Sequence, residues 1–189
     1  LGSSDNKENI FKNLKYVSNK MLLKKNRLIL MNQTHSNKVV VIKKENLGLK
    51  RINSDAIITK TKGLGLGVVT ADCVPIIVYD AKNKIIGCIH AGWKGASSGI
   101  IKNTISKIKK INSNNEIYAA IGPCIGKKSY EVDLKFYKKF LFKSKKNKKY
   151  FLKKNKKKKL FNLRGYVSDK LTELKVKVYQ VNYDTFKEK

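Results

Sequence analysis

Two histidines and one of the three cysteines stand where metal chemistry is possible. His35 follows turn-like residues ahead of a predicted strand, and His90 closes another predicted strand and opens the run Ala91–Gly95. Cys73 lies in a polar interruption between two apolar runs. Two imidazoles and one thiolate supply the three protein ligands of a catalytic zinc site, whose fourth position is left to water. The spacing matches no short zinc motif, so the residues alone leave structural roles open for these side chains.

The same side chains also permit chemistry without a metal. With Cys73 as nucleophile and His90 as base, the chain would be a thiol hydrolase or amidase. A nucleophilic thiol is free and open to alkylation, so metal analysis separates the two interpretations. Cys88 lies inside an apolar run and is expected in the core. Because the cysteines are odd in number and widely spaced, we expect reduced thiols rather than a disulfide framework.

Short β-branched runs separated by turn residues predict the strands that position these residues. They lie at 39–42, 56–59, 67–70, 75–78, 85–89 and 117–121, with a late, half-exposed strand at 175–180. Continuous apolar runs of this kind predict strands that are buried on both faces. Gly63, Gly65 and Gly67 alternate, which indicates turn and close-packing roles rather than a phosphate-binding loop.

Three amphipathic helices are expected to cover the sheet. The first begins at Ser97 or Ser98 as N-cap, and the apolar stripes of the three are Ile100, Ile101, Ile105 and Ile108; Val132, Phe136 and Phe140; and Leu163, Val167, Leu171 and Leu174. Strands interleaved with such helices predict an α/β fold on the border of α+β. We therefore expect residues 1–189 to form a single layered domain with a mixed β-sheet covered by helices.

Positive charge dominates the composition. The chain has 43 basic and 13 acidic residues, a formal net charge of +30, and only three arginines. Such a balance favours polyanionic partners, although a nearly pure lysine excess is also typical of compositional drift in the source genome. Residues 143–159 include eleven lysines and are expected to be a solvated surface loop or a ragged helix end. The alternative is a polyanion-binding arm without catalysis.

Targeting and membrane signals are not found in the sequence. The longest weakly charged stretch, residues 63–78, is interrupted and too short for the roughly 20 apolar residues of a membrane span. The chain opens without the basic start and apolar core of a signal peptide. We expect a cytoplasmic protein whose true start is missing.

Six sequence blocks resemble one known family in order and content. They are Asn32–His35, Asp55–Thr59, Ala71–Pro75, His90–Gly95, Ile121–Gly126 and Ser129–Val132. Together they closely resemble the multicopper polyphenol oxidoreductase or laccase-domain family. Its members are also described as purine nucleoside phosphorylases and, in some bacteria, as peptidoglycan editing factors. By this resemblance, the alternative thiol hydrolase or amidase would edit cell-wall precursors. The resemblance runs through nearly the whole chain.

The resemblance implies a zinc enzyme that acts on purine nucleosides. By resemblance, His35, Cys73 and His90 are the zinc ligands. The implied reactions are phosphorolysis of adenosine, inosine, guanosine and S-methyl-5'-thioadenosine, with adenosine deamination as a second activity. Asp72 is the carboxylate nearest in sequence to move protons at C6 of adenine. Two histidines and three cysteines cannot furnish a multicopper cluster, so a copper oxidase is the least supported interpretation.

Other candidate residues surround these blocks. Lys94, flanked by Trp93 and Gly95, is the candidate phosphate-binding residue, although relatives usually carry arginine there and lysine loses the bidentate fork. Trp93 is a candidate for stacking on a purine. Cys124, Tyr130 and Glu131 are candidates to line the pocket. The chain also stops short of a closing aromatic and Arg-rich segment of the family, so we expect truncation at both ends.

Overall fold

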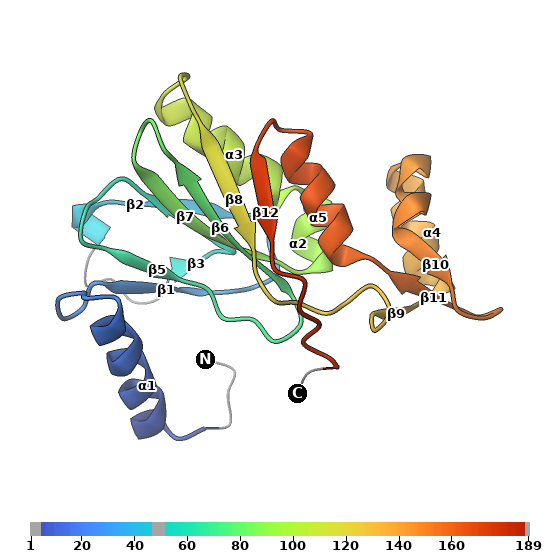
Figure 1. The fold of residues 1–189 in the computed structure, drawn as a ribbon, viewed down its shortest axis with the longest axis horizontal. Helices are drawn as coiled ribbons and strands as arrows, with labels where there is room; N and C mark the ends of the chain where they lie inside the picture. The colour runs from blue at the N-terminus through green and yellow to red at the C-terminus, as the bar shows by residue number, and fades with distance from the viewer. Residues whose placement is uncertain (1–4, 47–51, 188–189) are drawn as a thin grey trace.

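The computed structural model describes residues 5–46 and 52–187 (Figure 1). The elements are, in order, α1 (Lys7–Lys20), β1 (Leu28–Asn32), β2 (Val39–Ile42), η1 (Lys44–Asn46), β3 (Ile52–Asn53), β4 (Ala56–Thr59), β5 (Gly65–Gly67), β6 (Val74–Asp80), β7 (Ile85–Ala91), α2 (Trp93–Ser98), α3 (Ile100–Ile111), β8 (Ile117–Ile121), β9 (Glu131–Asp133), α4 (Leu134–Lys143), η2 (Lys145–Tyr150), β10 (Phe151–Lys153), β11 (Lys158–Phe161), α5 (Leu163–Thr172) and β12 (Lys177–Gln180). The prediction of truncation at both ends stays a prediction, and residues 1–4 and 188–189 lie outside the described part.

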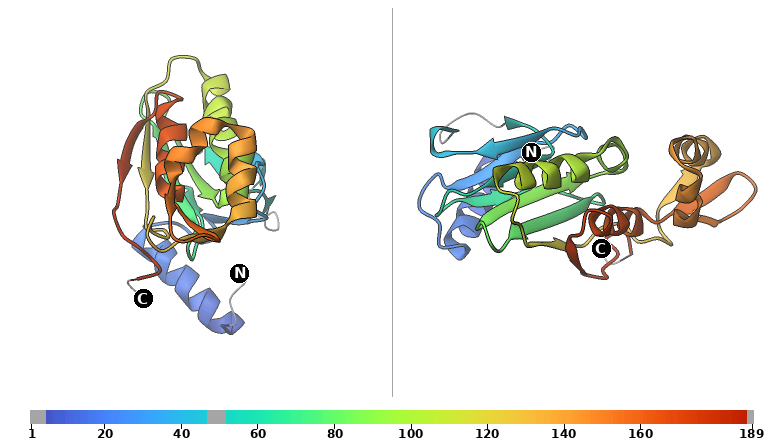
Figure 2. Two further views of the ribbon diagram at one scale, coloured as in Figure 1. Left: turned by 90° about the vertical axis from the view of Figure 1, so that its right-hand side faces the viewer. Right: turned by 90° about the horizontal axis from the view of Figure 1, so that it is seen from above.

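A mixed six-stranded sheet forms the centre of the domain. Its order is β12-β8-β6-β7-β4-β2, in which the two outer pairs are parallel and the inner pairs are antiparallel. Helices α3 and α5 pack on one face (Figures 1 and 2). The isoleucine stripe of α3 is fully buried against the sheet. These features confirm the predicted layered α/β domain with a mixed sheet covered by helices. The helix expected to carry Val132, Phe136 and Phe140 differs, because Val132 lies in β9 and α4 packs against β9 and β11 rather than on the main sheet.

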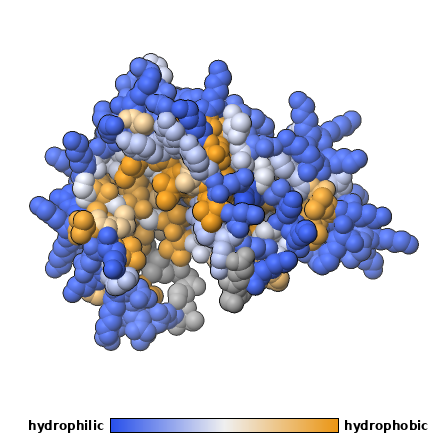
Figure 3. Space-filling model, viewed as in Figure 1, coloured by the Kyte–Doolittle hydropathy of each residue, from blue (hydrophilic) through white to orange (hydrophobic). Residues whose placement is uncertain are grey.

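The opposite face of this sheet is covered only in part by the described residues. A small sheet, β3-β1-β5, packs a second apolar cluster against β4 and β7. Over β6 and β12, however, Ile77 and Tyr179 remain 62% and 63% exposed. Figure 3 shows apolar side chains at the surface over the central strands. The prediction that residues 75–78 are buried on both faces is therefore wrong, because only the side of β6 that carries Ile76 and Val78 meets a helical layer.

The predicted helix start at Ser97 or Ser98 is also wrong. These serines end a separate short helix, α2, and their hydroxyls donate to the carbonyl oxygen of Lys94 over 3.1 and 2.8 Å. Gly99 then adopts a left-handed conformation with φ of 97° and caps the start of α3. Glycine takes this conformation without a Cβ clash, so the chain turns there between the two helices.

The glycine-rich segment 63–67 packs closely as predicted, but the strand that follows from it lies at other residues than predicted. Gly63 turns with φ of 73°, and Cβ atoms at Gly65 and Gly67 would collide with Leu23 and Leu30. The strand predicted at 67–70 instead occupies Gly65–Gly67, and residues 68–73 after it form no strand. The late strand is confirmed as β12, at the edge of the main sheet and parallel to β8.

The lysine-rich segment is folded rather than a loop or a ragged helix end. After α4 it forms η2 and the antiparallel β10–β11 hairpin, which pairs with β9 (Figure 1). Tyr150 and Asn147 are buried, and Phe151 stacks on Phe161 with ring centroids 4.8 Å apart. These anchors order the backbone while the lysines point outward, and Glu131 pairs with Lys154 and Lys158. Within the described residues, no helix has the length and apolar character needed to cross a bilayer.

Candidate metal centre

Three of the side chains singled out in the sequence meet at one point. The donor atoms of His35, Cys73 and His90 all lie within 4.8 Å of one another. Sγ of Cys73 is 3.8 Å from Nε2 of His35, and the two imidazoles meet edge to face with centroids 4.7 Å apart. Tetrahedral zinc spaces its nitrogen and sulfur ligands about 3.3–3.7 Å apart. The donor set and its spacing therefore suit one metal ion, after small adjustments of the side chains.

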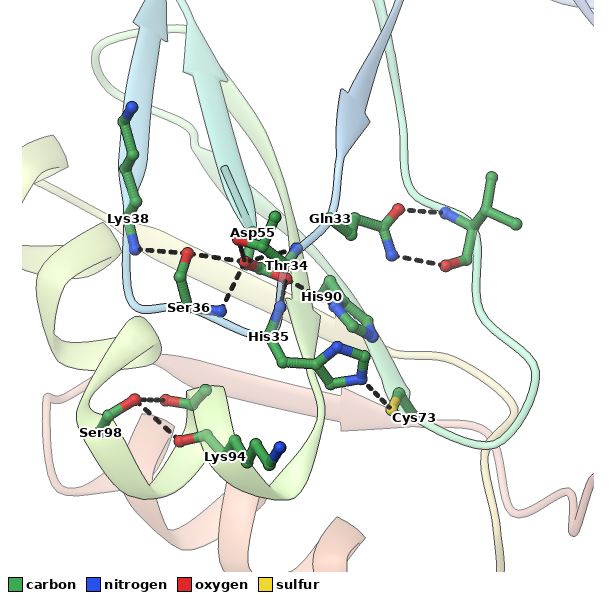
Figure 4. Close-up of polar contacts among 12 residues, drawn as sticks. Gln33, Thr34, His35, Ser36, Lys38, Asp55, Cys73, His90, Lys94 and Ser98 are labelled. Carbon is green, nitrogen blue, oxygen red and sulfur yellow. Dashed lines mark hydrogen bonds and ion pairs between the residues drawn. The ribbon is translucent and has the colours of Figure 1, made fainter. Parts of the chain in front are cut away.

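Separate elements deliver the three donors to one end of the main sheet (Figure 4). His35 lies in the loop between β1 and β2, where its φ of 58° is left-handed. Cys73 immediately precedes β6, and His90 is the penultimate residue of β7. Because Pro75 pairs with His90 in the β6–β7 register, Cys73 lies beside the end of β7. The sheet thus brings two donors together, and the β1–β2 loop adds the third.

Asp55, just before β4, organises the centre, and sequence reasoning gave it no role. Its carboxylate is fully buried and accepts a 2.8 Å hydrogen bond from Nδ1 of His90. It also accepts from the backbone N–H groups of Thr34, His35 and Ser36 and from the hydroxyls of Thr34 and Ser36. A carboxylate only accepts, so Nδ1 of His90 carries the proton and Nε2 is left free as a ligand atom.

The electrostatics of the centre follow from burial and these hydrogen bonds. Burial alone would raise the pKa of Asp55, but the bonds from His90, Ser36 and Thr34 outweigh it and lower that pKa. Burial lowers the pKa of His90, so its imidazole is neutral and able to bind a metal. Burial, with the charges of Asp72 and Asp55, raises the pKa of the Cys73 thiol. A nucleophile and a metal ligand both need the thiolate, so this shift in the metal-free site does not separate the thiol hydrolase from the metal-site interpretation.

A cavity of about 520 Å³ opens beside the three donors. Its lining consists of Met31, Asn32, Gln33, His35, Val69, Thr70, Ala71, Asp72, Cys73 and His90. Asp72 is half-buried there and accepts a 2.8 Å hydrogen bond from the hydroxyl of Thr185. Asp72 therefore lies at the same cavity as the donors. The sequence left this open, because adjacent residues of a strand, such as Asp72 and Cys73, normally point to opposite faces.

Lys94 and Trp93 lie beside this cavity rather than in its lining. Nζ of Lys94 is 5.7 Å from the ring centroid of Trp93, and that ring packs edge to face on Phe136 at 4.9 Å. The link to the centre is Gly92, where a Cβ would stand 2.8 Å from the His35 ring and 2.9 Å from Sγ of Cys73. The start of α2 therefore approaches the donors closely through a glycine.

The remaining pocket candidates, Cys124, Tyr130 and Glu131, are not part of the cavity lining. Burial raises the pKa of Tyr130 to about 12, and its ring packs edge to face on Phe161 with centroids 5.7 Å apart. Cys124 is buried, where Nε of Arg164 donates to its sulfur over 3.2 Å. Glu131 instead faces the lysines of the β10–β11 hairpin, so the structure does not bring it to the cavity.

Comparisons with known proteins identify the family of this chain. A profile of the multi-copper polyphenol oxidoreductase laccase family matches residues 1–189. The purine nucleoside phosphorylase RC0672 of Rickettsia conorii is 37% identical over 186 residues, which cover 97% of this chain and 75% of that protein. A second such phosphorylase, RP494 of Rickettsia prowazekii, is also 37% identical, over 185 residues and the same shares of the two chains.

Solved structures show the same fold. The hypothetical protein YfiH of Bacillus licheniformis matches with a TM-score of 0.91 and 23% identity, covering 98% of this chain and 74% of that one. The protein NMB0706 of Neisseria meningitidis matches with a TM-score of 0.88 and 28% identity, covering 99% and 75%. Since the profile spans the whole sequence, this chain belongs to the multi-copper polyphenol oxidoreductase laccase family.

Proposed function

We propose that this chain is a zinc-dependent purine nucleoside phosphorylase that also deaminates adenosine. The observation that carries the proposal is the meeting of His35, Cys73 and His90 at a cavity that Asp72 also lines. The relatives named purine nucleoside phosphorylase supply the substrate class, which is purine nucleosides with phosphate. We extend this class to adenosine, inosine, guanosine and S-methyl-5'-thioadenosine.

The donor set favours zinc over the copper of the family's name. His35 and His90 would bind through Nε2 and Cys73 through Sγ, and two nitrogens with one thiolate is a ligand set typical of catalytic zinc. The hydrogen bond from His90 to Asp55 fixes the tautomer that such binding needs. When bound, zinc supplies a Lewis acid that lowers the pKa of a water molecule.

Asp72 serves the deamination in this proposal, and Lys94 serves the phosphorolysis. In deamination, water adds to C6 of adenine and ammonia leaves, and the Asp72 carboxylate takes and returns the proton. In phosphorolysis, a phosphate oxygen bonds to C1' of the ribose as the bond to N9 breaks and the purine leaves with a proton. Lys94 provides a cation for the phosphate from beside the cavity.

Asp72→Asn is expected to lower adenosine deamination by about 100-fold or more while zinc content stays near one ion per chain, because an amide cannot accept the proton. Asparagine still offers an oxygen to Thr185, so the loop should keep its anchor. The measurement is inosine formation alongside metal analysis of the same preparation. Equal loss of zinc and activity would show that Asp72 is structural instead.

The function itself is tested by metal analysis together with incubation of adenosine with and without phosphate. Release of adenine that depends on phosphate supports phosphorolysis, and inosine formed without phosphate supports deamination. A protein that binds no zinc, and whose Cys73 is rapidly alkylated, would favour the thiol hydrolase instead. A zinc-loaded protein that converts no purine nucleoside would reject the proposed activity.

The lysines of residues 143–159 are expected to be dispensable for turnover. None of them lines the metal cavity, and exposed charges act weakly across a salt-screened surface. Replacing Lys153, Lys156 and Lys157 with glutamine leaves the buried Tyr150 and Asn147 in place, which a deletion would not. We expect adenosine turnover to change less than about twofold, while the salt dependence of DNA affinity falls by up to about three in slope.

The matching measurement is turnover and DNA affinity at two salt concentrations for the native chain and the triple variant. A collapse in turnover with zinc content and folding intact would place this segment in the active site. Specific DNA binding by a chain without turnover would support the polyanion-binding alternative.

A further inference from the structure

The segment that carries Cys73 has an unusual attachment. Between β5 and β6, residues 68–73 form no strand pairing of their own. The side-chain amide of Gln33 instead bonds twice to one backbone residue, Val69 (Figure 4). Nε2 of Gln33 donates to the Val69 carbonyl over 2.7 Å, and Oε1 accepts from the Val69 N–H over 2.9 Å. The carboxamide thus acts as a peptide group would in a neighbouring strand, with one donor and one acceptor.

This amide joins two of the three donor-bearing segments. Asp55 already ties the His35 loop to His90, and the β6–β7 pairing sets Cys73 beside His90. The side chain of Gln33, two residues before His35, connects the His35 loop directly to the Cys73 segment. The other polar anchors given by Asp72 run to Thr185 and to the N–H of Ile125, away from that loop.

We propose that Gln33 is a positioning residue that holds the Cys73 segment against His35 before a metal binds. The proposal rests on the zinc site argued above. Without this amide, the segment would have to be ordered at the moment of binding, and that loss of conformational freedom would weaken metal affinity. Only a side chain with both a donor and an acceptor can make the pair of bonds, which excludes glutamate and methionine of similar length.

The test compares Gln33→Met, Gln33→Glu and a matched control in the full chain. Asn37→Ala also removes a side-chain amide bond to backbone from the β1–β2 loop, but that bond goes to the carbonyl of Ser98. We expect zinc binding, measured by chelator competition, to weaken by about 10–100-fold in both Gln33 variants. Asn37→Ala should stay within about twofold of the native affinity.

Two further readouts separate positioning from a general loss of stability. The thiolate-to-metal absorption band of the cobalt-loaded protein should weaken or shift in the Gln33 variants, while the Tm of the metal-free protein stays close to that of Asn37→Ala. The alkylation rate of Cys73 in the metal-free protein should rise several-fold as its segment loosens. Cys88 and Cys124 are buried and serve as internal references.

Native zinc affinity and an unchanged cobalt spectrum in both Gln33 variants would overturn the proposal. If the native chain itself binds no zinc, the proposed function fails, and the alkylation rate alone decides the role of Gln33. An unchanged rate would then reject it as well. If Gln33→Met does not fold, Gln33→Glu, which keeps the side-chain shape, carries the same comparison.

Discussion

Cys73→Ser is expected to lower zinc affinity by more than about 100-fold, since even the loss of a partner behind a ligand costs 10–100-fold. The substitution keeps a small polar side chain but removes the thiolate that lies 3.8 Å from Nε2 of His35. Two imidazoles without the thiolate leave the ion with fewer protein ligands than a catalytic zinc site uses. Zinc content after dialysis against a weak chelator, and competition with a stronger one, measure the loss.

The matched control is Cys88→Ala. Cys88 is buried in the apolar cluster between the two sheets and lies outside the donor group. Its replacement removes a thiol from the same chain, so it should cost some stability but leave zinc content unchanged. A Cys73→Ser protein that keeps its full zinc content would remove Cys73 from the ligand set.

Asp55→Ala is expected to destabilise the metal-free protein by about 3–5 kcal/mol. Each buried donor left without an acceptor costs about 1–3 kcal/mol. Rearrangement of the loop, or water that enters the space left by the carboxylate, relieves part of this cost. The side chain is fully buried and receives the His90 ring and the N–H groups of three successive residues. The left-handed conformation at His35 then loses the contacts that hold it. Urea denaturation of the metal-free chain gives the free energy of unfolding directly.

Asp133→Ala provides the comparison for Asp55→Ala. Asp133 accepts one backbone hydrogen bond, from Phe136 at the start of α4, so its loss should cost only about 1 kcal/mol. Zinc affinity should fall with Asp55→Ala and stay unchanged with Asp133→Ala. Similar unfolding free energies for the two variants would mean that Asp55 does not organise the centre.

The elements with dense apolar patterns could be predicted from the sequence. The stripe from Ile100 to Ile108 is fully buried on the sheet, and the strand at 56–59 has its expected position. Helix α1 was not predicted, although Ile10, Leu14 and Val17 recur at helical spacing after Asn6, its N-cap. Its apolar side chains do not enter the core, since none of its residues is buried. In the lysine-rich segment, the many lysines led to the prediction of a solvated loop. Tyr150 and Phe151, whose aromatic contacts order the backbone there, were too few to indicate a folded hairpin.

The candidate site was predictable to the extent that chemistry is visible in residue type. Histidine and cysteine are common metal ligands, so His35, Cys73 and His90 were candidates, but their spacing matches no short zinc motif and the ligand set rested on the family resemblance. The roles of Asp55 and Gln33 depend instead on partners that lie 20 and 36 residues away in the chain and are largely backbone groups. A backbone amide looks the same at every position, so residue type carries no information about such a bond. The one available signal for a role of Asp55 is that this charged residue directly precedes an apolar run that predicts a buried strand.

Delivery of the donors by separate segments makes a bound ion a cross-link of the chain. His35 and Cys73 are 38 residues apart, and joining them closes a loop as a disulfide would. Unlike a disulfide, a reversibly bound ion leaves the unfolded chain, so it stabilises the folded state by its binding free energy, which grows with the concentration of free metal. Metal release would therefore loosen this end of the sheet first, and amide hydrogen exchange at the start of β6 and the end of β7 would measure that local opening.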